Sequence, residues 1–329
     1  MEKAIMFSTR DDEIPFMEKE NEKYGFEVTY EKAPMTMENI QRTKGIGLIS
    51  VSSAYPINEE MLRILQQNGV RYIATRATGH NHVDTELAKA YGIRLGYVPK
   101  YSPNSISEFA VAMALAVVRN MKAGIMKGNE HDFTYAGLMG KQIKGMTVGV
   151  IGDGNIGFEV IKSFYGMGCK VLTMSRHEKP HVMQYAQYVD FEELIRSSDI
   201  ITLHCPLTET NKNMLNEEAF EKMKDGVYII NTARGGLIDH MAMRKYLDSG
   251  KVAGFGMDVY VGEGAYIRKD LSGEEINEEL FLDLIHRPNV IYMPHIAFLT
   301  EEAVSTIEQI TFANMYEFVK KGASVNDLW

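Results

Sequence analysis

The sequence predicts an α/β protein of two lobes, the second of which is built on a doubly wound parallel sheet. Three observations support this prediction. The 329 residues are about twice the length of a typical domain. Short apolar, β-branched runs alternate with amphipathic stretches along the chain, which is typical of βαβ units. A glycine-rich turn at residues 152–157 directly follows one of these runs and opens a helical pattern.

The first hundred residues form a small α/β lobe. Five apolar runs with β-branched residues predict strands at Lys3–Ser8, Glu27–Tyr30, Gly47–Ser52, Tyr72–Thr75 and Arg94–Tyr97. Residues with helical spacing between them predict helices near Ile14–Tyr24, Asn58–Gln67 and Asp84–Tyr91. These elements make a small lobe with a core of its own.

A second lobe begins near Ser102. Ser105 can cap a helix, and Glu108 stands three positions later as in a capping box, so we expect an apolar helix from Ser105 to about Met121. Six strands are then expected, at Thr147–Ile151, Lys170–Met174, Ile200–Cys205, Val227–Asn231, Val252–Asp258 and Asn289–Met293. Helical stretches separate them, which predicts the doubly wound sheet.

The amphipathic segment Glu301–Lys320 follows the last strand, and we expect it to pack back against the first lobe. The predicted domains are therefore residues 1–100 with 299–329, and an inserted domain of residues 101–298. Two crossings would join them, as in a hinge with a cleft between two lobes.

Composition limits the partners. The net charge of −9 argues against nucleic acid and favours a small-molecule ligand. Both cysteines, Cys169 and Cys205, stand in apolar strand-like runs, as reduced thiols of a cytoplasmic protein do. The apolar stretch Ala4–Phe7 is too short for a signal peptide, no run has membrane-spanning length, and no metal-ligand spacing occurs, so no membrane, export or metal is expected.

The glycine-rich turn predicts a dinucleotide site. Gly152 permits the tight turn, Gly154 lets the backbone approach a pyrophosphate, and Gly157 lets the helix pack closely. Asn155 and Ile156 would present the first amides of that helix to the phosphates. A tight turn without a ligand is the alternative, but the strand before it and the helix after it favour cofactor binding.

The tip of the next strand favours NADP(H) over NAD(H). An acid is expected there if a free ribose is bound, whereas this chain has Ser175 and Arg176, which can donate to a 2′-phosphate and pair with it. Lys179 follows. The alternative is a solvated basic loop whose charge Glu178 partly cancels.

Arg234, Glu263 and His295 follow three late strands and carry the remaining polar chemistry. Ligands of doubly wound sheets bind at the carboxyl ends of strands, where these three could converge. Arg234 would grip the carboxylate of a 2-oxo acid, and His295 would donate a proton to the developing alkoxide. Glu263 would hold the tautomer of His295 and favour its protonated form. Taken singly, each is more often a surface ion pair or a satisfied polar group.

These residues resemble the D-isomer-specific 2-hydroxyacid dehydrogenase family over nearly the whole chain. The matches are the glycine motif from Val148 to Gly157, the segment Asn231–Gly235 with its arginine, the acid at Glu263 and the Pro294-His295 pair. The resemblance implies a Rossmann-type domain inserted in a smaller flavodoxin-like substrate domain. It also implies cofactor contacts from His204, Pro206, Thr232, Ala233 and Asp258.

Within that family the chain resembles the D-lactate dehydrogenase branch. Residues 146–176 are similar to the vancomycin-resistance type, including the Ser-Arg tip. The resemblance implies substrate contacts from Ser52, Arg76, Thr78, Gly79, Tyr101 and Phe298. The backbone amides of the Arg76–Gly79 segment would face the substrate anion. Ser52 stands where several members carry a bulky aromatic, so we expect room for larger 2-oxo acids.

The expected activity is reduction of a 2-oxo acid to a D-2-hydroxy acid. Glyoxylate or hydroxypyruvate reduction is the enzymatic alternative, and a nucleotide-sensing binding protein of the same fold is the alternative of another class. Residues 105–121 and 132–140 resemble the family's subunit contacts, so a homodimer is expected. Packing of Ala112, Met113, Leu115 and Val118 inside the large lobe is the other interpretation of that helix.

Overall fold

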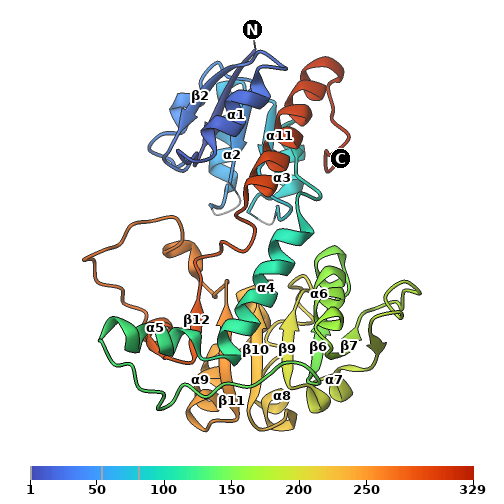
Figure 1. The fold of residues 1–329 in the computed structure, drawn as a ribbon. Coiled ribbons are helices and arrows are strands. Elements are labelled where there is room, and N and C mark those ends of the chain that lie inside the picture. The colour runs from blue at the N-terminus through green and yellow to red at the C-terminus, as the bar shows by residue number, and fades with distance from the viewer. Residues whose placement is uncertain (1, 53–54, 81) are drawn as a thin grey trace. The chain divides into compact units, whose positions relative to one another are not determined.

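The computed structural model describes residues 2–52, 55–80 and 82–329. The chain divides into two compact units, of which unit 1 comprises Met1–Ser102 and Leu299–Trp329 and unit 2 comprises Pro103–Phe298 (Figure 1). Both units are α/β, which confirms the predicted fold class. Unit 2 is continuous in sequence and interrupts unit 1.

Unit 1 is a five-stranded parallel sheet in the order β2-β1-β3-β4-β5. Its strands are β1 (Lys3–Phe7), β2 (Glu27–Glu31), β3 (Leu48–Val51), β4 (Tyr72–Thr75) and β5 (Arg94–Gly96). Its helices are α1 (Ile14–Asn21), α2 (Glu59–Asn68), α3 (Thr85–Ala90), α11 (Glu301–Lys321) and the 3-10 turn η1 (Ile40–Thr43). Every predicted strand and helix of this lobe is present.

Both faces of this sheet are buried. Ile5 and Phe7 of β1 point into the core formed with α2 and α3, whereas Ala4 and Met6 point into the core formed with α1 and α11. Strands buried on both faces carry continuous apolar runs, as these do. The prediction that α11 packs against the first lobe is confirmed, because Phe312, Met315 and Phe318 complete the second of these cores.

Unit 2 is a seven-stranded parallel sheet in the order β12-β11-β10-β9-β6-β7-β8. Its strands are β6 (Thr147–Ile151), β7 (Lys170–Met174), β8 (Gln187–Tyr188), β9 (Ile200–Leu203), β10 (Val227–Asn231), β11 (Val252–Met257) and β12 (Val290–Tyr292). Its helices are α4 (Pro103–Val118), α5 (Met121–Asn129), α6 (Asn155–Gly166), α7 (Phe191–Ser197), α8 (Glu217–Lys222), α9 (His240–Asp248) and α10 (Glu279–His286), with 3-10 turns η2 (Gly235–Leu237) and η3 (Glu263–Ala265).

Helices cover both faces of this sheet as well. α4 and α6 share one core with Val148, Val150 and Ile230 of the strands. α7, α8, α9 and α10 share the other core with Ile151 and Phe255. All strands are parallel, so their carboxyl ends lie at one edge of the sheet. The strand order runs from β6 to β8 on one side and from β9 to β12 on the other, and ligands of such sheets bind at this edge where the order reverses.

The predicted start and end of the first helix of unit 2 are wrong. Ser105 is not the N-cap, because α4 begins at Pro103, whose ring presets φ for the first helical turn. The helix ends at Val118 rather than near Met121, because Asn120 takes φ +52°, in the left-handed region that ends a helix. A separate helix, α5, then starts at Met121.

Among the described residues, no helix alone has the length and apolar character of a membrane span. α4 and α5 meet that condition only when they are counted together across a 65° bend.

Candidate functional site

The turn between β6 and α6 is shaped for close approach. Gly152 has φ +99°, and a Cβ there would lie 2.8 Å from the carbonyl oxygen of His204. A Cβ on Gly157 would lie 1.9 Å from the carbonyl oxygen of Gly152. Neither position accepts a side chain, because the turn, α6 and the end of β9 pack backbone to backbone. The glycines therefore hold the amino end of α6 against the sheet.

Gly154 differs from the other two glycines. It is the N-cap of α6, and a Cβ there would meet nothing within 4 Å. The first amides of α6, including those of Asn155 and Ile156, have no partner within the helix and carry the positive end of its dipole. An open space in front of such amides fits the pyrophosphate of a dinucleotide.

Thr232 gives a second sign of a ligand at the carboxyl edge of this sheet. It follows β10, and its Oγ1 is buried without a hydrogen-bond partner among the described residues. Buried hydroxyls are normally satisfied, so this one fits a bound polar group. Ala233 beside it is held by its amide, which donates to Oδ1 of Asn231 at 3.0 Å.

His204 and Pro206 follow β9, the strand between β10 and β6 in the sheet. His204 is partly buried, and desolvation of its ring lowers its pKa to about 3, so the imidazole is neutral. Its Nε2 lies 2.8 Å from Oγ1 of Thr202, which fixes the ring against the sheet. The ring is therefore neutral and fixed next to the glycine turn.

The end of β7 carries no acid. Ser175 and Arg176 follow Met174 directly and are exposed, as is His177. Lys179 turns back toward the glycine turn, where its Nζ contacts the buried carboxylate of Asp153 at 3.0 Å. Asp153, Lys179 and Tyr188, which also bonds this carboxylate, were not singled out together from the sequence. The sequence feature that could have indicated this contact is an acid inside the glycine motif together with a lysine after the next strand.

His295 and Glu263 form a close pair of titratable side chains at the carboxyl edge. Nδ1 of His295 lies 2.6 Å from Oε1 of Glu263, and both side chains are half-buried or more. Oε2 of Glu263 accepts the amide of Tyr260 at 2.7 Å, which fixes the carboxylate. His295 therefore has a fixed orientation, with Nε2 as its remaining nitrogen.

The backbone at His295 is constrained. Its φ is +57°, which is uncommon for a residue with a side chain. Asp258 holds this turn: its carbonyl accepts the amide of His295 at 2.9 Å, and its carboxylate accepts the amides of Ile296 at 2.8 Å and Ala297 at 3.0 Å. Both oxygens of this buried carboxylate are thus bonded to the histidine turn, although Asp258 was expected to contact the cofactor.

Arg234 lies at the end of β10, next to β11. A Cβ on Gly235 would lie 2.4 Å from the carbonyl carbon of Tyr260, so the arginine turn packs directly on the segment that leads to Glu263. The guanidinium is exposed, and its Nη1 donates to the carbonyl of Ala233 at 2.6 Å. Since β10, β11 and β12 are neighbours, Arg234, Glu263 and His295 follow three adjacent strands at one edge.

In unit 1, Arg76 lies in the interior rather than at a ligand surface. Its guanidinium donates to Oγ of Ser50 at 2.9 Å and to the carbonyl of Phe7 at 2.7 Å, and lies 3.7 Å from Glu308. Its amide donates to the carbonyl of Val51 at 3.0 Å. Arg76 therefore holds β1, β3 and α11 together, and neither its amide nor its side chain is directed to an external anion.

The other expected substrate residues are divided between the units. Ser52 is buried directly after β3, and Thr78 donates its hydroxyl to the carbonyl of Val98 at 2.8 Å. Gly79 and Tyr101 also belong to unit 1, whereas Phe298 ends unit 2.

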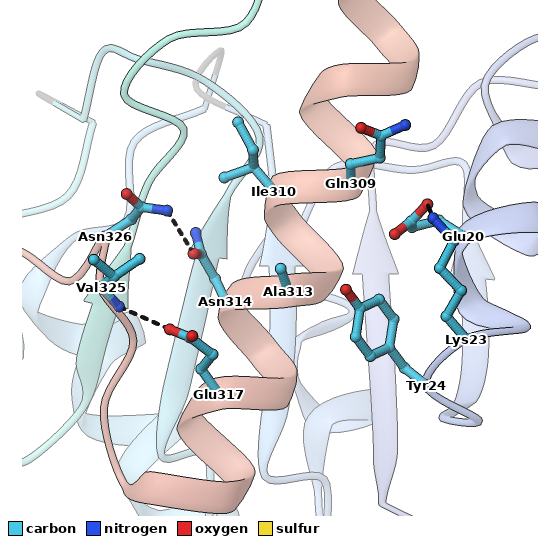
Figure 2. A pocket seen from close by; sticks show the side chains of 10 residues that line it. All are labelled: Glu20, Lys23, Tyr24, Gln309, Ile310, Ala313, Asn314, Glu317, Val325 and Asn326. Carbon is cyan, nitrogen blue, oxygen red and sulfur yellow. Dashed lines mark hydrogen bonds and ion pairs between the residues drawn. The ribbon is translucent and has the colours of Figure 1, made fainter.

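A surface pocket of about 390 Å³ in unit 1 lies between α1, α11 and the C-terminal segment (Figure 2). Its polar groups pair with one another: Glu20 with Lys23, the amide of Val325 with Glu317, and Asn326 with Asn314. No residue of the expected site lines it. In the described part of the chain, no three His, Cys, Asp or Glu side chains are grouped as a metal site.

Comparison with known proteins gives consistent matches. Residues 111–297 match the family model described as D-isomer specific 2-hydroxyacid dehydrogenase, NAD binding domain. An aromatic 2-oxoacid reductase of Clostridium sporogenes is 38% identical over 98% of both chains, and a D-lactate dehydrogenase of Lactiplantibacillus plantarum is 38% identical over 97% of both. Among solved structures, the apo D-lactate dehydrogenase of Escherichia coli matches with a TM-score of 0.90 at 33% identity, covering 99% of this chain and 100% of that one. A D-2-hydroxyisocaproate dehydrogenase matches with a TM-score of 0.88 at 34% identity, covering 99% of each.

Proposed function

This chain belongs to the D-isomer-specific 2-hydroxyacid dehydrogenase family, in its D-lactate dehydrogenase branch, and we propose that it reduces a 2-oxo acid to the D-2-hydroxy acid with His295 as the acid. Unit 2 is the Rossmann-type domain of this family, and the chain is an oxidoreductase that uses a nicotinamide dinucleotide. The roles of individual residues and the choice of substrate and cofactor are the proposal.

The observation that carries the proposal is the 2.6 Å contact between His295 and Glu263. A carboxylate on Nδ1 keeps that nitrogen protonated and leaves Nε2 to exchange a proton with the substrate oxygen. During reduction, Nε2 of His295 donates its proton to the oxygen of the ketone as it becomes a hydroxyl. Glu263 stabilises the imidazolium before this transfer and orients the ring throughout.

Arg234 supplies the second function. Arg234 has an exposed guanidinium and follows β10, which lies two places from β12 in the sheet, the strand before His295. A guanidinium matches the two oxygens of a carboxylate with fixed geometry, so Arg234 would hold the acid group and polarise the ketone beside it. The bound nicotinamide supplies the hydride to the ketone carbon.

The cofactor would be held by the turn from Gly152 to Gly157. The pyrophosphate fits the open space at Gly154, and His204, Pro206 and the unpartnered hydroxyl of Thr232 would contact the rest. We propose that NADPH is preferred to NADH. Support comes from Ser175 and Arg176 at the end of β7, where an acid would repel a 2′-phosphate.

We further propose that the enzyme accepts side chains larger than a methyl group. Ser52 is buried directly after β3, at a position where several members of the family carry a bulky aromatic. The similarity to the aromatic 2-oxoacid reductase and to the D-2-hydroxyisocaproate dehydrogenase also favours larger substrates. Thr78, Gly79, Tyr101 and Phe298 remain the proposed substrate contacts besides Ser52.

The test measures initial rates of 2-oxo acid reduction with NADPH and with NADH. The substrates are pyruvate, 2-oxobutyrate, a branched-chain 2-oxo acid, phenylpyruvate, glyoxylate and hydroxypyruvate, and the product's configuration is determined with a chiral column. We expect a D product, highest kcat/KM on one of the larger acids, and loss of turnover in His295→Ala. Preference for glyoxylate or hydroxypyruvate would select the alternative reductase, and nucleotide binding without any turnover would select the sensing protein.

We also propose a cytoplasmic homodimer. Both cysteines are free thiols, as in a reducing compartment. Apolar side chains after α4 are exposed, with Phe133 at 77%, Tyr135 at 89% and Met139 at 94%, as expected of a surface that a second copy covers. α4 itself is covered by α6 and the sheet, so residues 121–140 rather than α4 support the dimer. Light scattering after gel filtration measures the mass, and a monomer would contradict this proposal.

A further inference from the structure

Asp153 is a buried carboxylate inside the glycine turn that the roles above do not use. Its exposed fraction is 3%. Tyr188 donates its hydroxyl to Oδ2, and the hydroxyl of Ser175 also hydrogen-bonds the carboxylate. Nζ of Lys179 lies 3.0 Å from Oδ1 and 2.8 Å from the carbonyl oxygen of Asp153. Three residues from the segment after β7 therefore converge on one acid in the turn after β6.

This acid is ionised at neutral pH. Burial raises the pKa of Asp153, but the hydrogen bonds from Ser175, Tyr188 and Lys179 outweigh burial and hold the pKa below its ordinary value. Burial and the contact with Asp153 raise the pKa of Tyr188 to about 12, so the phenol remains a donor. Lys179 is the cation in direct contact with the carboxylate, and it balances this charge.

The location of the pair gives it a role. Ser175 is the first residue after β7, where an enzyme that binds the free ribose of NAD carries its acid. In this chain the acid is Asp153, which is hydrogen-bonded to Ser175 and belongs to the turn that would face the pyrophosphate. Its charge would repel a 2′-phosphate if Lys179 did not cancel it.

We propose that Asp153 and Lys179 together set the charge at the adenosine 2′ end of the cofactor site and thereby decide between NADPH and NADH. This inference rests on the proposed function, since it takes the cofactor site as its premise. While the pair is intact, Ser175 and Arg176 meet a 2′-phosphate without an opposing charge. When Lys179 is absent, the carboxylate acts through Ser175 as the strand-end acid of an NAD enzyme does.

The test measures dissociation constants of NADPH and NADH by the fluorescence of the bound nucleotide, without substrate. Lys179→Met should raise the ratio of the NADPH constant to the NADH constant about tenfold, and Asp153→Asn should lower it about tenfold. The double variant Asp153→Asn/Lys179→Met should return to the wild-type ratio. Both single shifts should shrink as salt is added, because they come from partly exposed charges.

Two control variants separate this role from others. Lys162→Met on α6 removes a lysine with the same 38% side-chain exposure, also paired with an acid, in the same unit. It should leave the ratio unchanged, which excludes an effect of net charge alone. Lys179→Arg keeps the cation and should keep the wild-type ratio.

The outcomes are distinct. If Lys179→Met and Asp153→Asn weaken both nucleotides equally, the pair only holds the loop, and the inference is overturned while the proposed function stands. If Lys179→Met does not fold, Asp153→Asn and Lys179→Arg still decide the question. If the wild-type protein binds neither nucleotide, the inference and the proposed function both fail.

Discussion

Glu263 and His295 are separated by 32 residues in the chain, and yet Oε1 of the acid lies 2.6 Å from Nδ1 of the imidazole. The contact exists because β11 and β12 are neighbouring strands, and the segments that follow them leave the sheet at the same edge. The second oxygen of Glu263 is fixed by the amide of Tyr260, so the acid cannot rotate without losing a bond.

Glu263→Gln should lower kcat about a hundredfold and change KM much less, because the amide cannot stabilise a charged imidazole. Steady-state rates with phenylpyruvate and NADPH give both constants. Glu278→Gln is the matched control, since Glu278 contacts the hydroxyl of Tyr260 but not His295. Equal losses in the two variants would mean that the loop, and not the pair, is what the reaction needs.

Asp258 should make unit 2 more stable in acid. Burial raises its pKa to about 6 from the ordinary 3.8, although the amides of Ala297 and Ile296 act in the opposite direction. The folded protein therefore holds this proton more tightly than the unfolded chain. Its contribution to stability grows as the pH falls through about 6, levels off below 3.8, and is lost as the pH rises.

Asp258→Asn cannot titrate, so it isolates this contribution. The free energy of opening of wild type relative to the variant should rise by about 2 kcal/mol from neutral pH to about pH 4. Hydrogen exchange of the β11 and β12 amides, compared between the two proteins at each pH, measures it. A difference independent of pH would show that Asp258 is ionised throughout this range.

Two glycine substitutions should separate folding from cofactor binding. Gly157→Ala places a methyl group 1.9 Å from the carbonyl of Gly152 and should lower the melting temperature by several degrees. Gly154→Ala meets no atom within 4 Å and should leave the melting temperature unchanged, but weaken NADPH about tenfold by occupying the space at the amino end of α6. Calorimetry and fluorescence titration measure the two effects. Full NADPH affinity in Gly154→Ala would place the pyrophosphate elsewhere.

Ser52→Phe should reduce kcat/KM for phenylpyruvate about tenfold more than for pyruvate, because the added ring takes volume that only the larger substrate needs. Each substrate serves as the control for the other. Equal losses would show that residue 52 does not limit the size of the substrate.

Arg76→Leu should destabilise unit 1 by about 3 kcal/mol, because it removes a buried guanidinium that donates to Ser50 and to the carbonyl of Phe7 and leaves these acceptors unpaired. Arg71→Leu, which removes an exposed arginine paired with Glu2, should cost little. Thermal unfolding compares the two. A stable Arg76→Leu with a raised KM would instead give Arg76 a role at the substrate.

The strands could be predicted almost completely, because both faces of each sheet are buried and each strand is a continuous apolar run. β8 was missed, since its two residues, Gln187 and Tyr188, have no such run. The start of α4 was wrong because a serine three residues before a glutamate is common, whereas Pro103 fixed the first turn. Periodicity alone does not locate such ends.

The candidate site was less predictable than the sheets. The positions of Arg234, Glu263 and His295 after three strands indicated that they converge. They did not indicate that both carboxylate oxygens of Asp258 would accept backbone amides of the turn after His295. The interior position of Arg76 depends on α11, which lies more than two hundred residues later in the chain. The convergence on Asp153 depends on how the segment after β7 folds back, and no local pattern specifies that.

The return of α11 to unit 1 has a consequence for synthesis on the ribosome. Unit 2 is continuous, so its sheet can close as soon as β12 has emerged, while unit 1 still lacks Phe312, Met315 and Phe318. Until these arrive, the face of the sheet that contains Met6 and Leu48 is covered only in part, by Met17 of α1 and by Phe26. The nascent chain therefore exposes part of an apolar surface during translation of the whole inserted domain, and transiently exposed surface of this kind promotes aggregation.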